Sequence, residues 1–335
     1  MKSSELIESF LEFKCINRGR SERTAAAYRL ALSRLVDFFG DRDPLDATHD
    51  DLTLFTGAWL FKKGLEATSR RPHVAAVREF YKWLLDTKRI RGNPAAGIQY
   101  PQTGLKLPRV MTLSNAEKLM WAPDFSTFEG VRDGALFSLL VGCGMRISGL
   151  VGMNQSGIIK DEIEGKVRLI AKVTEKGKRD RKIPIPAQAD LQLRLYLEHP
   201  DLQAIDRALQ NGDQVLFVST RNRTCPPHEY IGERRRLNRR AVLESIKKYG
   251  SRAGIPNDQL HPHALRHLFG TELAESEIDM LTRQQLMGHA DPKSTAIYTH
   301  LAMRKLARDS DRANPLAKMR TPVSDLLRRL GSKKA

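Results

Sequence analysis

The sequence is poor in cysteine and has no long apolar run, and these shortages exclude several classes of protein. Its three cysteines, Cys15, Cys143 and Cys225, are odd in number and far apart. They can form neither a disulfide framework nor a CxxC metal site, and they suit a reducing cytoplasm. The longest apolar run, around residues 134–145, contains glycine and serine and is too short to span a bilayer. We therefore expect a cytoplasmic protein, neither extracellular nor embedded in a membrane.

Motifs for cofactor chemistry are also missing. No GxxxxGK[ST] phosphate loop occurs, and the segment 142–144 begins a GxG but lacks the third glycine of a dinucleotide fingerprint. No set of carboxylates is spaced to hold a pair of metal ions, and Asp50-Asp51 beside His49 is more typical of a helix start than of a metal site. We expect no cofactor and no metal.

Positive charge is what the sequence has in excess. Its 335 residues contain 56 Lys and Arg against 39 Asp and Glu, a formal net charge of +17. Residues 1–98 carry a net charge of +4, and the remainder carries +13. Such an excess indicates a polyanionic partner, with nucleic acid as the first candidate and an anionic membrane surface as the second. Positive charge in both parts is expected if both contact the same polyanion.

Apolar periodicity and breaker residues predict a mainly α-helical protein with a small β-hairpin or sheet, in the α+β class. Residues 1–98 predict four helices, and residues 99–111 have the proline and glycine content of a linker. Residues 112–320 predict a second unit that opens with a helix capped by Ser114. Residues 321–335 form a basic tail with a short apolar stripe.

Several boundaries follow from the same patterns. In the first unit, caps at Ser4 and Ser21 and breaks at Gly40 and Gly64 separate the helices, of which the third starts at Asp50-Asp51. In the second unit we expect a helix near 131–141, a helix from about Met145, a hairpin over 165–186, and mainly helix beyond Asp190. Along the first hairpin strand, one face should bury four apolar residues, Val167, Leu169, Ala171 and Val173.

The most informative cations stand where helices should begin. A helix N-terminus carries partial positive charge, so arginine or protonated histidine is unfavourable there unless an anion binds. Arg146 follows a glycine break, and Pro262 fits a first helical position, which puts His263 and Arg266 on one face of the first turn. Phosphate is the natural anion, because arginine can bind two of its oxygens at once. The alternative is that each arginine pairs with a surface carboxylate.

An ordered set of short motifs is more specific than any single one. They are GMRIS at 144–148, a hairpin Lys176, PHALRH at 262–267, LMGH at 286–289 and IYTH at 297–300. This set resembles the tyrosine recombinase (phage integrase) family, most closely its Xer-like members. The resemblance covers nearly the whole chain and implies a SAM-like helical DNA-binding unit followed by a catalytic unit.

The resemblance also implies the chemistry and the residues that carry it. Tyr298 would attack a DNA phosphodiester and form a 3′-phosphotyrosine, without ATP or metal. Arg146 and Arg266 would hold the phosphate, and His289 would donate a hydrogen bond to it. Lys176 would protonate the leaving 5′-oxygen, while His263 would assist proton transfer at the phenol.

Two positions depart from the family pattern. Gly149 stands where the family usually has glutamate, and Glu175 replaces the usual glycine before the hairpin lysine. The second change leaves Lys172 and Lys178 open as alternatives to Lys176 for the general acid. Basic residues near the hairpin and in the polar loop 219–237 are expected to contact DNA phosphates. They are Lys178, Arg179, Arg181, Arg234, Arg235, Arg239 and Arg240.

Double-stranded DNA with short core sites, at the nucleoid, is the partner that the resemblance implies, with four protomers on two duplexes. The tail stripe, which includes Val323 and Leu326, would then dock on a neighbouring subunit. Two other functions stay open: an architectural DNA-binding protein without catalysis, and a type IB topoisomerase-like enzyme that nicks and reseals one duplex. The biological task could be dimer resolution or the integration and excision of a mobile element.

Overall fold

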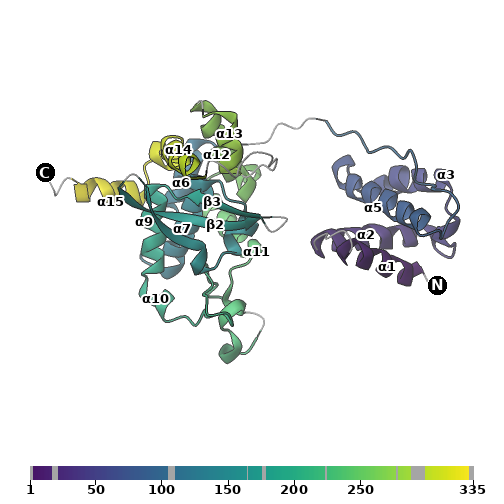
Figure 1. The fold of residues 1–335 in the computed structure, drawn as a ribbon, viewed down its shortest axis with the longest axis horizontal. Coiled ribbons are helices and arrows are strands. Elements are labelled where there is room, and N and C mark those ends of the chain that lie inside the picture. Colours follow the sequence, from purple (N-terminus) through teal and green to yellow (C-terminus); the bar gives the residue numbers. More distant parts are fainter. Residues whose placement is uncertain are drawn as a thin grey trace. The chain divides into compact units, whose positions relative to one another are not determined.

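A computed structural model describes residues 3–16, 22–104, 110–163, 165–175, 179–222, 225–276, 278–287 and 299–331. The chain divides into two compact units, Met1–Lys106 and Leu107–Ala335. The fold is mainly helical with one small antiparallel sheet, so the predicted class is confirmed (Figure 1). Among the described residues, no helix is both long enough and apolar enough to cross a membrane.

The first unit contains the four predicted helices around a core rich in aromatic rings. They are α1 (Ser3–Ile16), α2 (Glu22–Phe39), a third helix formed by α3 (His49–Leu54), a π-helical turn (Phe55–Trp59) and α4 (Leu60–Lys62), and α5 (Ala67–Asp86). Gly40 and Gly64 end their helices with φ of +59° and +80°, as predicted. Phe10 packs edge-on against Phe80, which joins α1 to α5. Ser4 lies within α1 instead of capping it, and the predicted cap Ser21 lies outside the described residues.

The chain leaves this unit along α5, through an exit segment that we define as residues 94–101. Arg78 Nη1 donates to the carbonyl of Ile98 at 3.0 Å, and Arg71 Nη1 donates to that of Pro101 at 3.0 Å. The Tyr100 ring lies within 5.1 Å of the Arg71 guanidinium and 5.3 Å of the Arg78 guanidinium. Ile98 is itself buried in the core. The chain is therefore attached to the helical unit as far as Pro101.

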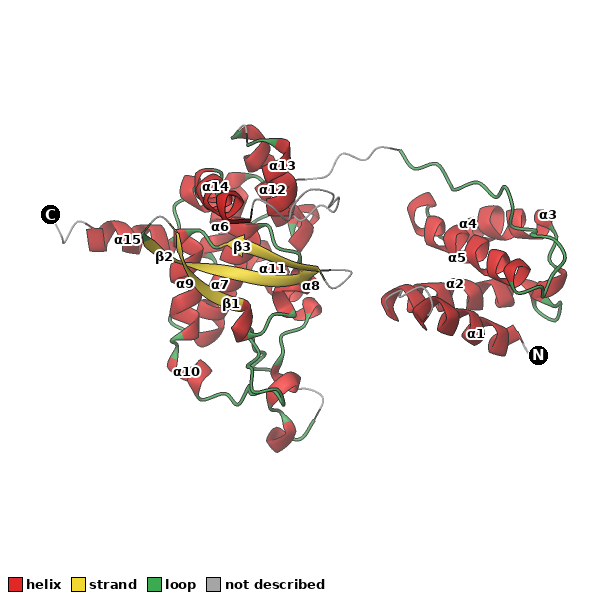
Figure 2. Cartoon of the chain, viewed as in Figure 1, coloured by secondary structure: helices red, strands yellow, loops and turns green. Residues whose placement is uncertain are grey.

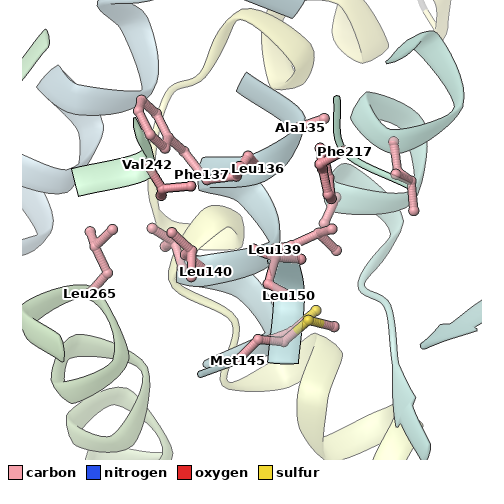
Figure 3. Close-up of a cluster of buried hydrophobic side chains, with 14 of the residues drawn as sticks. Ala135, Leu136, Phe137, Leu139, Leu140, Met145, Leu150, Phe217, Val242 and Leu265 are labelled. Carbon is pink, nitrogen blue, oxygen red and sulfur yellow. The ribbon is translucent and has the colours of Figure 1, made fainter. Parts of the chain in front are cut away.

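The second unit is built around α7, which is buried along most of its length. Its elements are α6 (Leu113–Trp121), α7 (Phe128–Cys143), α8 (Ile147–Val151), β1 (Ile158–Ile163), β2 (Lys166–Glu175), β3 (Arg179–Pro184), α9 (Ala187–Leu197), α10 (Pro200–Gln203), α11 (Arg239–Arg252), α12 (Pro262–Glu275), α13 (Met280–Met287), α14 (Thr299–Arg312) and α15 (Pro322–Gly331). Figure 3 shows Leu136, Phe137 and Leu140 of α7 in the core, with Leu265 of α12 beside them.

The sheet has the order β1-β2-β3 with antiparallel pairing throughout (Figure 2). Leu169, Ala171 and Val173 of β2 face the main core. On the opposite face, Ile170 packs with Ala307 of α14. The sheet is therefore covered by helices on both faces, and α14 is attached to its outer side.

Two sequence expectations for this unit are corrected, and one strand was not predicted. Val167 is 62% exposed, because it is the second residue of β2 and pairs with Glu162 next to the turn that joins β1 to β2. The sequence did not predict β1. The cap of α6 is Thr112 and not Ser114, since the Thr112 hydroxyl accepts from the Asn115 N–H at 3.2 Å and the helix begins at Leu113.

Gly144 ends α7 in a left-handed conformation, with φ of +55°. A Cβ at this position would lie 2.2 Å from Cδ1 of Phe269, so two independent constraints require glycine. Gly254 in the same unit has φ of +69° but open space around it.

We expect Gly144→Ala to lower the free energy of unfolding by about 2–4 kcal/mol, from left-handed strain and overpacking together. Gly254→Ala, the matched control, should cost only about 1 kcal/mol because it adds strain without a clash. Urea denaturation of both variants measures the difference. Equal losses would show that the contact with Phe269 is not a constraint.

Candidate functional site

Three of the six residues predicted to form the site are described. These are Arg146, His263 and Arg266, whereas Lys176, His289 and Tyr298 lie outside the described residues. The three come from two segments more than a hundred residues apart in sequence, so the fold must bring them together.

The left-handed turn at Gly144 sets the position of Arg146. After Gly144 the chain reverses, and Arg146 becomes the N-cap residue of α8 with extended backbone angles. The predicted helix start near Met145 is confirmed. Arg146 is half-buried there, so its charge is held close to the protein and not extended into solvent.

The first turn of α12 carries the other two residues. Pro262 occupies the first helical position, as predicted, and His261 caps the helix by accepting from the Ala264 N–H at 3.0 Å. His261 therefore has a structural role, as the cap of this helix. His263 is exposed to solvent and Arg266 is buried, although both lie on the same side of the turn.

Arg266 connects three segments of the site. Its Nη1 donates to the carbonyl of Gly144, and its Nη2 donates to the carbonyl of Met287 at the end of α13. Only 6% of Arg266 is exposed. Its guanidinium therefore fixes the backbone two residues before Arg146 and two residues before His289.

Nearby positive charge acts on His263. Partial burial of its ring is the largest cause that lowers its pKa below the ordinary value of 6.5. Cationic neighbours lower it further, in the order His267, His261, Arg266 and Arg146. The two arginines thus lie close enough to His263 to act on it electrostatically. Because folding lowers this pKa, the unfolded chain binds the proton more tightly, and the contribution of His263 to stability falls as pH drops below about 6.5.

This arrangement brings two arginine side chains within electrostatic reach of a partly buried imidazole. It can bind an anion, and the imidazole can accept a proton near neutral pH. Among the described residues, no group of three or more His, Cys, Asp or Glu side chains could hold a metal ion.

Of the two lysines left open as alternatives to Lys176, the structure describes only Lys172. Lys172 pairs with Lys182 in the middle of the β2–β3 ladder and is exposed. Its position alternates with Val173, so it lies on the outer face of the sheet with Ile170. Lys178, like Lys176, lies outside the described residues, and so does the side chain of Arg179.

Most of the arginines expected at DNA have partners within the chain. Arg234 pairs with Glu229, Arg240 pairs with Glu244 at 2.9 Å, and Arg235 stacks 4.1 Å from the Tyr230 ring. Arg239 is exposed at the start of α11. A cleft of about 530 Å³ beside α11 also contains Arg221 and Lys248, which the sequence analysis did not single out.

Arg181 is half-buried and bonds to the backbone. Its Nη1 donates to the carbonyls of Gln285 at 3.3 Å and Leu286 at 2.5 Å, in the last turn of α13. No pattern in the sequence indicated this contact, because it joins residues more than a hundred positions apart.

Comparison with known proteins shows two family matches along the chain. Residues 109–305 match the phage integrase family, and residues 7–88 match the N-terminal SAM-like domain of phage integrases. The tyrosine recombinase XerC of Xylella fastidiosa (strain M23) is 33% identical over 94% of this chain and 98% of its own. The tyrosine recombinase XerD of Yersinia pestis is 30% identical over 94% of this chain and 99% of its own.

Solved structures share the fold. A XerH site-specific recombinase bound to a palindromic difH substrate has a TM-score of 0.64 at 17% identity, over 92% of this chain and 83% of its own. A lambda integrase tetramer bound to a Holliday junction has a TM-score of 0.60 at 18% identity, over 92% of this chain and 77% of its own.

We expect His267→Gln to raise the pKa of His263, because it removes the strongest of the neighbouring cationic influences. NMR titration of the imidazole C–H resonances measures the pKa of His263 in the wild-type protein and in His267→Gln. The resonance that is missing in His263→Gln identifies the signal of His263. A wild-type pKa at or above 6.5, or no rise in the variant, would contradict the described electrostatics.

Proposed function

This chain belongs to the phage integrase family of tyrosine recombinases, and on that basis we propose that it cuts and rejoins DNA at specific sites through a 3′-phosphotyrosine intermediate. The observation that supports this most is the convergence of Arg146, His263 and Arg266 at two helix starts. Positive side chains at positive helix ends are unfavourable by themselves, and a bound phosphate removes the penalty.

The proposed reaction exchanges one phosphodiester for another. Tyr298 Oη attacks the scissile phosphorus while the bond from phosphorus to the 5′-oxygen breaks. The phenol proton passes to His263, and Lys176 protonates the departing 5′-oxygen. The products are a phosphotyrosine on the 3′ side and a free 5′-hydroxyl. A 5′-hydroxyl from another strand can reverse the same steps, which rejoins DNA without ATP.

The arginines would stabilise the transition state more than the bound substrate. The phosphodiester carries one negative charge and gains about one more as the fifth oxygen adds. Arg266 is held in place by two backbone carbonyls before the reaction, so it need not reorganise as this charge develops. His289 would contribute a hydrogen bond to the same phosphate. His263 is suited to its role because its lowered pKa keeps it neutral at pH 7.

We propose double-stranded DNA as the partner and a tetramer on two duplexes as the active assembly. The likeness in fold to a lambda integrase tetramer bound to a Holliday junction supports this proposal. The net charge of +17 supports binding to a polyanion. The resulting exchange could resolve dimers of a chromosome or plasmid, or move a mobile element.

A nicked DNA substrate that loses its 5′ fragment on cleavage tests the chemistry. We expect the wild-type protein to accumulate a covalent adduct and Tyr298→Phe to form none, because only the phenolic oxygen can attack. Tyr100→Phe is the matched control, since it keeps the ring that stacks with Arg71 and should form the adduct normally. Denaturing gels measure the adduct. Persistence of the adduct in Tyr298→Phe would show that the nucleophile is misassigned.

We further propose that α15 contacts a neighbouring subunit in this assembly. Its start is held in its own unit, where Arg320 bonds through its carbonyl to Trp121 Nε1 and through its N–H to Glu117 at 3.1 Å. Val323 is buried against that unit, whereas Leu326 is 39% exposed.

We therefore expect Leu326→Asp to weaken cooperative assembly on DNA about tenfold while the monomer stays folded, because it places a charge in an apolar contact. Val167→Asp is the control, since it changes an exposed apolar residue elsewhere in the same unit. A gel-shift titration measures the cooperativity. Unchanged cooperativity in Leu326→Asp would count against the subunit contact.

A further inference from the structure

We propose that Arg181 is a positioning residue for strand cleavage, which fixes the end of α13 and thereby the entry of the chain into the segment that carries His289. This inference rests on the proposed function. It also replaces the DNA-phosphate contact that the sequence indicated for Arg181.

The register of the sheet directs Arg181 toward the helices. Arg181 of β3 pairs with Val173 of β2, and Val173 is buried in the main core. Ile183, two residues further along β3, is buried in the same core. Because side chains alternate along a strand, Arg181 lies on this inner face. Arg181 also acts on the buried Cys143 thiol, opposing the rise in its pKa that burial causes, which places the guanidinium near the last turn of α7.

Two arginines from different elements hold the end of α13. The last carbonyls of a helix have no partner within it, so they need donors from elsewhere. Arg181 of β3 donates to the carbonyls of Gln285 and Leu286, and Arg266 of α12 donates to that of Met287. Positive charge at a helix C-terminus is favourable, and charge-assisted bonds are among the stronger ones. Three consecutive carbonyls are therefore fixed by the sheet and by the site arginine together.

The attachment matters because α13 is short. A helix of eight residues has little stability of its own in water and depends on tertiary contacts. Leu286 and Met287 are buried against Phe269 and Leu273 of α12, but Leu281 near the start of α13 is exposed. The start of α13 is held separately by Asp279, whose side chain accepts from the Thr282 N–H at 2.9 Å. His289 follows Met287 by two residues in sequence, so a displacement of this carbonyl end would be passed along the chain to the residue that the proposed function places at the phosphate.

The positioning role and the phosphate-contact role predict different kinetics. A lost phosphate contact weakens DNA binding and lowers the salt dependence of binding by about one unit of slope. A lost positioning contact leaves binding intact but displaces a catalytic group, and a displacement of about 1 Å can reduce a rate about 100-fold.

Arg181→Gln tests this with the nicked substrate, by single-turnover adduct formation at saturating protein and by binding at several salt concentrations. We expect a cleavage rate roughly 10- to 100-fold lower, with affinity and salt slope unchanged. Lys182→Gln is the matched control, because it removes one positive charge from the exposed side of the same strand and should cleave at the wild-type rate. Weaker binding with a lower salt slope, or wild-type cleavage by Arg181→Gln, would overturn the proposal.

A modified substrate distinguishes a defect that acts through the end of α13 from a defect that acts through the hairpin that carries Lys176. When sulfur replaces the scissile 5′-oxygen, the leaving group departs as a thiolate and needs no proton. We expect the Arg181→Gln defect to persist on this substrate, because His289 and not the acid is displaced. Restoration of the rate would overturn the proposal in favour of an effect on Lys176.

Arg181→Lys is a second variant that controls for loss of folding in Arg181→Gln. All rates are measured below the onset of thermal unfolding. Arg181→Lys keeps the charge and can donate to one carbonyl, so we expect an intermediate rate. A rate equal to that of Arg181→Gln at equal thermal stability would count against the carbonyl contacts. Absence of any adduct in the wild-type protein would instead refute the proposed function.

Discussion

The site depends on the hydrogen bonds that the buried guanidinium of Arg266 donates to two backbone carbonyls. The guanidinium donates to the backbone at the end of α7 and at the end of α13, and it lies in the first turn of α12. Burying a charge is costly unless hydrogen bonds compensate for it, and two carbonyl oxygens do so here. The same group therefore serves as a structural tie among three helices, and in the proposed function it also supplies positive charge to a phosphate.

The rest of the catalytic unit supports this tie from both sides. The left-handed turn at Gly144, pressed against Phe269, turns the chain so that the Gly144 carbonyl faces Arg266 and the next turn begins at Arg146. From the sheet, Arg181 holds the neighbouring carbonyls of α13. On the outer face of that sheet, Ala307 anchors α14, the helix that follows Tyr298 directly in sequence. The helices α13 and α14, which precede and follow residues 288–298 in sequence, are thus both attached to this unit.

The sequence correctly predicted those features that are determined by residues close together in the chain. The four helices of the first unit, the break after α7 and the proline start of α12 follow from glycine, proline and apolar spacing. The sequence failed where contacts between strands decide: β1 is defined by pairing with β2, and Val167 is exposed because it lies beside the turn between these strands. Both Thr112 and Ser114 can cap a helix, and packing, which the sequence does not show, determines that α6 begins after Thr112. The roles of Arg181 and Arg266 as backbone ties depend on carbonyls 21 to 122 residues away, which no local pattern reveals.

The exit segment has an evolutionary consequence. Ile98 completes the core of the helical unit, and Tyr100 and Pro101 are bound to arginines of α5. A gene fusion that joined a foreign helical unit to this catalytic unit before residue 98 would remove part of that core and expose apolar surface. Exchange of helical units among recombinases would therefore preserve folding only when the crossover falls beyond Pro101, so that each helical unit is inherited together with its own exit segment.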